Sequence, residues 1–244
     1  KLRMALRISK ANPTLAQQKA EEAVNHEVGV MTTNADNAEL TLASTNPFEI
    51  IMYEYNGGDS RVSADITSYM NGYNDPRRAA MFTESTFADG GYYGIRTGIN
   101  IPDGTIAHAY SNYNVKTDSK LIIMNSAESA FLRAEGALKG WNMGATAKEL
   151  YEQGIKLSFE QWGVQGADAY IADNSSMPQG YKDPAGLNSY SGATSQITIA
   201  WDDADAAKNL ERIITQKWIA NFPLGIEAWS EYRRTGFPKL MPVV

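Results

Sequence analysis

The chain has no cysteine and only two histidines, His26 and His108. Without cysteine there are no disulfides, no thiolate nucleophiles and no cysteine-based zinc or iron–sulfur sites. A histidine-rich metal site is excluded too, and a Ser-His-Asp relay would have to use one of the two histidines. Because many secreted proteins also lack disulfides, the missing cysteine leaves the cellular compartment open.

Long apolar runs and clustered positive charge are also scarce. The longest aliphatic run, residues 121–124, is far too short to cross a bilayer. The 22 lysines and arginines are outnumbered by 28 aspartates and glutamates, and the basic residues cluster in pairs at most. The net charge of −6 and the scattered positions of the basic residues exclude sequence-independent nucleic-acid binding. With 244 residues, 43% of them hydrophobic, we expect a folded globular chain with a sizeable core.

Motifs for catalysis and nucleotide binding are absent as well. The sequence contains no nucleophile elbow, zincin helix, dinucleotide fingerprint or phosphate loop, and we expect no cofactor and no metal. Asp202-Asp203-x-Asp205 lacks the glycine and the final glutamate of a helix–loop–helix calcium site. These acids are predicted to begin a helix, because a helix N-terminus favours negative charge. The 28 acidic residues leave a paired-carboxylate glycosidase open.

Helix signals occur at the beginning of the chain. Residues 1–8 are strong helix formers with no capping residue in front of them, and the first residue is Lys rather than Met. We therefore expect the chain to start inside a helix and to be a fragment whose upstream half is missing. Asn12 then caps a second helix, which is predicted to end near Gly29. His26 is predicted to lie in the last turn of this helix and is assigned no chemical role.

A pair of helices is predicted in the second half of the chain. Asn125 caps a helix over 126–138, and a second helix follows over 147–162. Because the loop between them is short, the two are predicted to pack antiparallel. In the second helix the small–aromatic–aliphatic spacing of Ala147, Tyr151 and Ile155 resembles that of a tetratricopeptide unit.

Loop-rich segments alternate with these helices. Residues 31–120 are rich in Asn, Gly, Asp and Tyr, and residues 164–200 in Gly, Ser, Asn, Asp and Pro, which disfavours long regular helices. After them, one helix is predicted from the acids at 202–205 to Phe222 and a short one over 226–234. Eight of the 13 tyrosines fall in the first loop-rich segment. Tyrosine, asparagine and arginine in loops suit sugars, because aromatic faces pack on pyranose rings while amides and guanidinium groups bond their hydroxyls.

Several segments, taken in order along the chain, resemble the SusD/RagB family. Three of them are residues 1–9, 127–141 and Tyr69-Met70-Asn71-x-Tyr73-Asn74-Asp75-Pro76-Arg77. The two most specific are Leu150-Tyr151-Glu152-x-Gly154-Ile155 with Glu160-Gln161-Trp162-Gly163, and residues 210–220 continuing to Glu227-Ala228-Trp229-x-Glu231-Tyr232-Arg233-Arg234-Thr235-Gly236.

The resemblance covers nearly the whole chain but only the C-terminal half of a family member. It implies a mainly α, SusD-like fold with tetratricopeptide-type helix pairs and a long loop-rich region. The missing half would carry a lipoprotein signal with its lipidated cysteine and most of the tetratricopeptide helices. We expect residues 1–244 to form one domain, divided into helices (1–30), a loop-rich glycan-binding region (31–120), a helix pair (121–163), a long loop (164–200) and C-terminal helices (201–244).

The function that the resemblance implies is glycan capture. Such a protein sits on the extracellular face of the outer membrane, held by a lipid anchor that this chain lacks, and covers a SusC-type TonB-dependent transporter. It binds an oligosaccharide without cleaving it. The family's ligand residues have no fixed motif, but its sugar-binding loops generally precede the segment that matches 127–141. The predicted glycan-binding residues in that region are Tyr53, Tyr55, Tyr92, Tyr93, Arg96 and Tyr110.

Other functions stay open at this point. The helix pair is also compatible with a helical-repeat scaffold that only contacts a partner protein and exposes an apolar groove. A family member that binds peptides and a helical glycosidase are further alternatives. By contrast, Asp75-Pro76-Arg77 and residues 227–236 are predicted to be structural, forming turns, caps and buried ion pairs.

Overall fold

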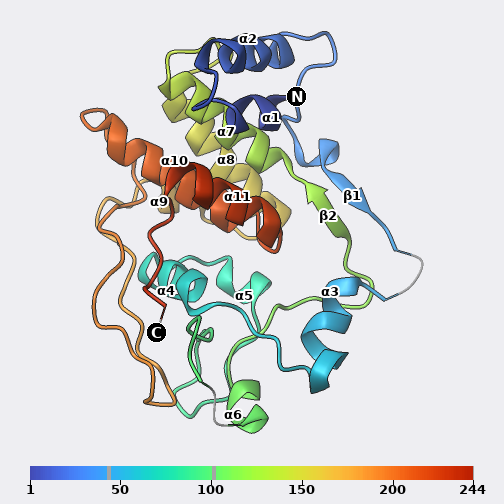
Figure 1. The fold of residues 1–244 in the computed structure, drawn as a ribbon, viewed down its shortest axis with the longest axis vertical. Helices are drawn as coiled ribbons and strands as arrows, with labels where there is room; N and C mark the ends of the chain where they lie inside the picture. Colours follow the sequence, from blue (N-terminus) through green and yellow to red (C-terminus); the bar gives the residue numbers. More distant parts are fainter. Residues whose placement is uncertain (43–44, 101–102, 244) are drawn as a thin grey trace.

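The computed structural model describes residues 1–42, 45–100 and 103–243, and it is mainly helical over them (Figure 1). The upper half of Figure 1 holds α1 (Leu2–Arg7), α2 (Pro13–Val24), α7 (Ser126–Leu138), α8 (Ala147–Gln161), α10 (Ala206–Ala220) and α11 (Gly225–Thr235). The lower half holds the short helical segments α3 (Pro47–Glu49), η2 (Ile50–Glu54), η3 (Tyr55–Gly57), α4 (Ala64–Gly72), α5 (Arg78–Met81) and α6 (Gly104–His108). The predicted fold class is confirmed.

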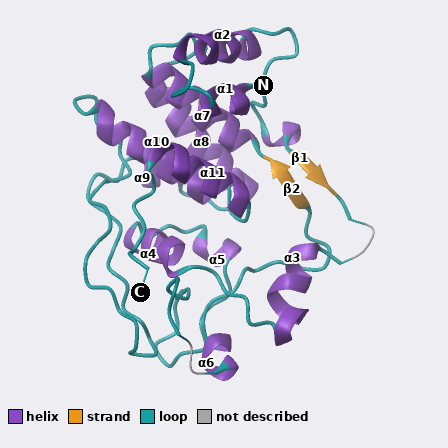
Figure 2. Ribbon diagram, viewed as in Figure 1, coloured by secondary structure: helices purple, strands orange, loops and turns teal. Residues whose placement is uncertain are grey.

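The remaining elements are small. They comprise η1 (Asn34–Asp36), α9 (Ala167–Ile171) and the strands β1 (Ala38–Leu40) and β2 (Leu121–Met124). The two strands pair antiparallel, with Ala38 opposite Met124 and Leu40 opposite Leu121. Loops dominate the lower half of the molecule (Figure 2). None of the helices in the described ranges is long and apolar enough to span a membrane.

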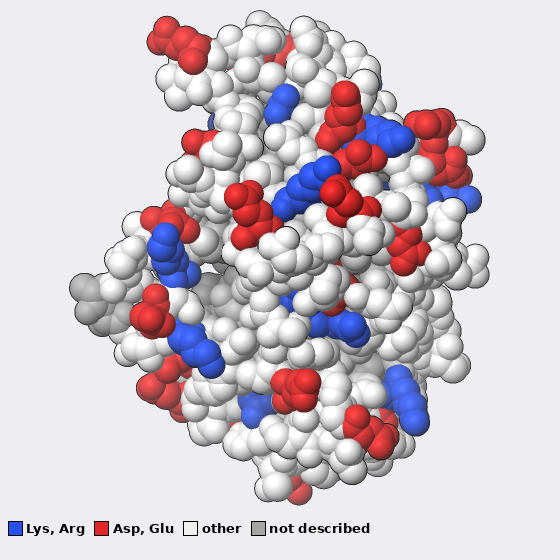
Figure 3. Space-filling view, turned by 180° about the vertical axis from the view of Figure 1, so that it is seen from behind, with Lys and Arg blue, Asp and Glu red and all other residues white. Residues whose placement is uncertain are grey.

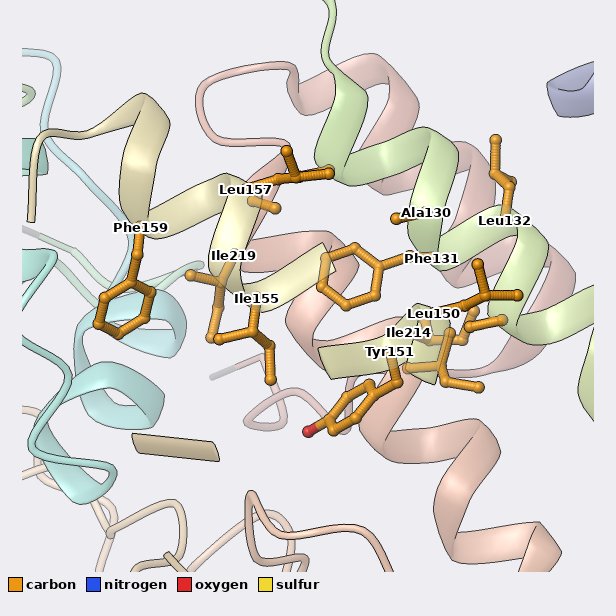
Figure 4. Packing of buried hydrophobic residues seen from close by; sticks show 14 of the residues in the cluster. Ala130, Phe131, Leu132, Leu150, Tyr151, Ile155, Leu157, Phe159, Ile214 and Ile219 are labelled. Carbon is orange, nitrogen blue, oxygen red and sulfur yellow. The ribbon is translucent and has the colours of Figure 1, made fainter. Parts of the chain in front are cut away.

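Helices α7 and α8 pack against each other as the predicted antiparallel pair, and both contribute many side chains to the core. Asn125 Oδ1 accepts a hydrogen bond from Glu128 N at 2.7 Å and so caps α7, while Thr146 and Glu149 form a capping box at the start of α8. The helices approach closely because α8 has a glycine where they meet. A Cβ added at Gly154 would lie 2.7 Å from the Phe131 ring. Phe131 lies among buried side chains of α8 and α10 (Figure 4).

A network of ion pairs joins α11 to its neighbours. Glu231 on α11 contacts Lys217 of α10, and its Oε1 lies 2.9 Å from Arg7 Nη1 on α1. Arg234 Nη2 lies 2.6 Å from Glu231 Oε2 and 2.5 Å from Glu135 Oε2 on α7. The side chains of Glu231, Lys217, Arg234 and Glu135 are nearly inaccessible to water. The prediction of a structural role for 227–236 is confirmed, since the segment contributes buried ion pairs.

The loop-rich half is fastened to the helices by Arg77. This side chain is fully buried together with Asp75, whose Oδ2 lies 2.5 Å from Arg77 Nη2. Arg77 Nη1 donates to Ser158 Oγ on α8 at 2.8 Å, and Nη2 donates to Gln216 Oε1 on α10 at 3.1 Å. The guanidinium also stacks over the Phe159 ring, 4.7 Å from its centroid. The predicted buried ion pair is therefore present, and it connects three segments that are distant in sequence.

The second helix differs from its prediction. It ends at Val24 rather than near Gly29, because Asn25 caps it by donating from its side chain to the Glu21 carbonyl. His26 consequently lies beyond the helix, and its Nδ1 accepts a hydrogen bond from Val28 N. The predicted cap at the other end is present, since Asn12 Oδ1 accepts from Leu15 N at 3.1 Å.

Removing the charge of Arg77 is expected to destabilise the whole chain. In Arg77→Met the Asp75 carboxylate stays buried without its partner, so the free energy of unfolding should fall by about 3–5 kcal/mol. The measurement is urea unfolding followed by circular dichroism. Arg233→Met is the matched control, because Arg233 is exposed and should lose less than about 0.5 kcal/mol. A loss at Arg77 as small as that of the control would contradict the central role given to this side chain.

The ion pairs of α11 predict how stability depends on pH. Burial by itself raises the pKa of Glu231, but Lys217 and Arg234 outweigh it and hold this pKa well below the usual 4.5. A depressed carboxyl pKa stabilises the fold above the unfolded pKa and loses this contribution as the pH falls below it. The free energy of unfolding should therefore drop below pH 4.5 in the parent chain and drop less steeply in Glu231→Gln. Glu27→Gln, at an exposed glutamate, should keep the parental slope.

Candidate functional site

A short aromatic turn protrudes from the loop-rich half. After Asn46, whose Oδ1 accepts from Phe48 N, the chain forms α3, continues as the π-helical turn η2 and ends in η3. Asn56 has a φ of 50° and Gly57 and Gly58 also have positive φ, so the chain reverses there. Single π-helical turns often occur at functional sites. We call residues 50–55 the aromatic turn.

The aromatic turn exposes unusually large apolar side chains. Tyr53 is 42% exposed and Tyr55 is 64% exposed, and Ile50 and Ile51 beside them are also exposed. Two exposed aromatic rings on one short segment provide a surface that can bind the apolar face of a ligand. Two of the predicted residues, Tyr53 and Tyr55, are therefore exposed on this segment.

A polar hollow of about 630 Å³ adjoins this turn. We call it the Tyr53 hollow; its lining includes Glu49, Tyr53, Thr83, Lys116, Thr117 and Asp118. The Tyr53 hydroxyl donates to the Tyr113 carbonyl at 2.6 Å, which fixes the ring at the edge of the hollow. Partial burial raises the pKa of Tyr53, so its hydroxyl stays neutral at physiological pH.

A tight turn forms another wall of the Tyr53 hollow. Ser119 N donates to the Lys116 carbonyl at 3.0 Å, and Lys116 N donates to Ser119 Oγ at 2.9 Å. Asn46 is almost fully buried, and its Nδ2 donates to the Ser119 carbonyl at 2.8 Å. Thr117 Oγ1 donates to Glu49 Oε1 at 3.0 Å. The backbone of this turn and the Thr117 hydroxyl are thus held in place before any ligand arrives.

The chemistry of the hollow suits an uncharged, hydroxyl-rich ligand. Carboxylates, hydroxyls and an ammonium group can bond hydroxyls, and the Tyr53 ring offers an apolar face. Figure 3 shows acidic and basic side chains interspersed on the back face of the molecule, without a large patch of one sign. Across the described ranges, no group of three or more His, Cys, Asp or Glu side chains is arranged to hold a metal ion.

The other predicted residues contact different segments. Arg78 lies over the Tyr92 ring, 5.7 Å from its centroid. Tyr93 packs against a small cluster with Tyr181 and Met241 near the C-terminus. These two tyrosines are half-buried and anchor the loop that carries them.

Arg96 and Tyr110 are likewise engaged with the long loop over 164–200. The Arg96 guanidinium donates to the carbonyls of Asn188 and Ser189 at 3.3 and 3.4 Å and lies 5.3 Å from the centroid of the Tyr190 ring. Tyr110 is only 4% exposed, and its hydroxyl donates to Asp183 Oδ1 at 2.5 Å. In this structure the Tyr110 ring is not accessible for stacking on a sugar.

Sequence reasoning missed several residues of the Tyr53 hollow. Glu49 and the segment 116–118 line it, although no spacing pattern distinguishes them. Asn46 gave a readable signal, because an asparagine directly before Pro47 is a typical helix cap. Its second function, fastening the turn at 116–119, depends on contacts across more than 70 positions.

Comparison with known protein families gives the same result as the fold. Residues 1–244 match the SusD-like family, described as Susd and RagB outer membrane lipoprotein. The chain therefore belongs to the SusD/RagB family, as the resemblance implied. A comparison with curated proteins found no match.

Solved structures of family members superpose closely on this chain. A SusD homologue from Bacteroides uniformis is 50% identical with a TM-score of 0.94, and the match covers 100% of this chain and 52% of that one. A chitin-binding SusD homologue from Flavobacterium johnsoniae is 48% identical with a TM-score of 0.93, covering 100% and 51%. One from Bacteroides ovatus is 45% identical with a TM-score of 0.90, covering 100% and 52%. The chain spans about half the length of these relatives.

The placement of Tyr110 generates a prediction. Tyr110→Phe leaves Asp183 without one hydrogen bond in a buried setting, so the free energy of unfolding should fall by about 1–3 kcal/mol. Oligosaccharide affinity should stay the same, because the ring is covered. Thermal unfolding and isothermal titration calorimetry measure the two effects. Normal stability together with weakened saccharide binding would instead show that Tyr110 contributes to the saccharide-binding surface.

Proposed function

We propose that this chain binds an oligosaccharide at the aromatic turn and the Tyr53 hollow, without cleaving it, at the outer face of the outer membrane. The bound glycan is then passed to a SusC-type TonB-dependent transporter. The observation that carries the proposal is the exposed ring of Tyr53 in the lining of a hollow that also has polar side chains, with the exposed ring of Tyr55 two residues further along the chain. Aromatic rings bind the apolar face of a pyranose, and the polar wall bonds its hydroxyls.

Two further observations support this function. The family is described as an outer membrane lipoprotein, and a relative that is 48% identical to this chain is named as chitin-binding. The open shape of the site also suits a protein that must release its ligand. We expect dissociation constants between millimolar and micromolar, about −4 to −8 kcal/mol.

A second candidate function is contact with a partner protein alone. It is favoured by the exposed apolar side chains Met4 on α1 and Ile226 and Trp229 on α11. Ile226 is 82% exposed and Trp229 is 59% exposed, so α11 presents an apolar surface. Saccharide binding by the purified chain would make this function insufficient. Binding of a purified SusC-type transporter without any saccharide binding would favour it.

The test is a panel of oligosaccharides, chitin oligosaccharides among them, together with short peptides. The purified chain should bind at least one glycan class, and mass spectrometry after overnight incubation should find that ligand intact. Tyr55→Ala should weaken binding about tenfold, equal to about 1.4 kcal/mol, because a stacked ring is lost. Tyr53→Phe should bind nearly normally, since it keeps the ring.

The matched control is Tyr232→Ala, which removes a tyrosine of α11 that stacks on Trp229 away from the aromatic turn. It should bind as the parent does. Equal binding by Tyr55→Ala and the parent would refute the assigned site. If cleaved products form and are no longer formed by Glu49→Gln, the chain is a glycosidase. If the chain binds only peptides, its ligand is a peptide rather than a glycan.

A further inference from the structure

Two asparagines of this chain, Asn56 and Asn71, are followed directly by glycine. Glycine has no side chain to shield its backbone nitrogen, so this nitrogen can attack the side-chain carbonyl carbon of the preceding asparagine. The two sites consist of the same dipeptide, but the structure places them in very different surroundings. Their surroundings therefore decide which of them can react.

Asn56 lies at an exposed tip, directly after the aromatic turn. Its backbone has a left-handed φ of 50° and a ψ of 39°. Asn56 and Gly57 are both exposed, and among the described residues no atom beyond the chain neighbours lies within 4 Å of a Cβ built on Gly57. Figure 1 shows this segment beyond α3, at the outer edge of the loop-rich half. Little therefore opposes rotation of the Asn56 backbone.

Asn71 is held in one conformation. It belongs to α4, its Nδ2 donates to the Tyr92 carbonyl at 2.7 Å, and its Oδ1 accepts from Arg78 Nη1 at 2.8 Å. A Cβ added at Gly72 would collide with the carbonyl oxygen of Met177, so another segment covers the backbone here. The side-chain amide and the glycine nitrogen are both immobilised. Reaction at Asn71 therefore requires local unfolding at the end of α4.

We propose that Asn56 is a site of spontaneous deamidation, whereas the fold protects Asn71. The Gly57 nitrogen attacks Cγ of Asn56, so that an N–Cγ bond forms, the Cγ–Nδ2 bond breaks, and ammonia leaves with the proton of the attacking nitrogen. Water then opens the cyclic imide at either carbonyl and gives aspartate or isoaspartate. In sum, an amide and water become a carboxylate and ammonium, without any oxidant or reductant.

Deamidation at this position changes the geometry beside the aromatic turn. Isoaspartate continues the chain through its side-chain carbon and so lengthens the backbone by one carbon. The reversal is tight, because Gly58 N donates to the Tyr55 carbonyl at 2.9 Å and a Cβ added at Gly58 would lie 2.8 Å from the Tyr53 carbonyl oxygen. An additional backbone atom between Tyr55 and Gly58 therefore moves the turn.

Deamidation also changes the charge of this segment. Both products add one negative charge between the exposed acids Glu54 and Asp59. We therefore expect glycan binding at the aromatic turn to weaken as Asn56 reacts. This effect on binding rests on the proposed function, whereas the modification of Asn56 does not.

Peptide mapping tests the modification site. The purified chain is incubated at mildly alkaline pH, where hydroxide removes the proton of the attacking nitrogen, and is then digested with trypsin. Arg61 lies between the two asparagines, so they fall in different peptides. The Asn56 peptide should gain about 1 Da, with fragmentation assigning the change to Asn56. It should convert at least about tenfold faster than the Asn71 peptide. Equal conversion of both, or no conversion of Asn56, overturns the proposal.

The same incubation in urea shows whether the fold causes the difference. Once α4 is unfolded, Asn71 has the same freedom as Asn56, and the two rates should converge. A rate at Asn71 that stays low in urea would mean that the surrounding sequence protects it, which contradicts the role given to α4.

Asn56→Gly is the matched variant for binding, because glycine adopts the same positive φ and has no amide to lose. After incubation the parent chain should bind its glycan about threefold more weakly than before, and Asn56→Gly should bind unchanged. If Asn56 reacts but binding stays constant, the modification site stands and its effect on the aromatic turn is wrong. If the fresh chain binds no saccharide, the proposed function fails, and the peptide map still decides whether Asn56 reacts.

Discussion

The buried guanidinium of Arg77 is the interaction on which the rest of the structure depends. It carries a charge into a site with no access to water, where an unpaired cation would be unstable. Asp75 neutralises it, and side chains of α8, α9 and α10 accept its remaining hydrogen bonds. Because these partners come from both halves of the chain, the loop-rich half has one position in which Arg77 is satisfied. The aromatic turn and the Tyr53 hollow belong to that half.

The helical half supplies the rigid support. Phe131 packs against Gly154. The ion pair of Glu231 with Lys217 holds α11 against α10, and that of Arg234 with Glu135 holds it against α7. Binding residues on loops keep a fixed geometry only when such a scaffold positions them. The same logic applies locally, since buried Asn46 fastens the turn at 116–119. A weak and reversible glycan site can thus be built from loops without losing its shape.

Much of the helical half was predictable from sequence because its signals are local. Asn125 and the apolar spacing after it defined α7, and the asparagine before Pro13 defined the start of α2. The C-terminal end of α2 was misjudged, because Asn25 caps the helix through a hydrogen bond that its sequence pattern does not distinguish. The short helices of residues 31–120 follow no clear period, so only the absence of long helices was predicted there.

The sequence by itself determined the mainly helical class, the α7–α8 pair, the buried pair of Asp75 and Arg77, and membership of the SusD/RagB family. These follow from patterns within a few residues or from motifs along the chain. Only the tertiary structure decided which tyrosines are accessible, exposing Tyr55 and covering Tyr110. Burial depends on what packs against a side chain from other segments, and here the Tyr110 ring packs against Phe87 while its hydroxyl bonds Asp183 of the long loop. The same reason explains why the Tyr53 hollow became visible only in the tertiary structure, since its lining comes from segments about 60 residues apart.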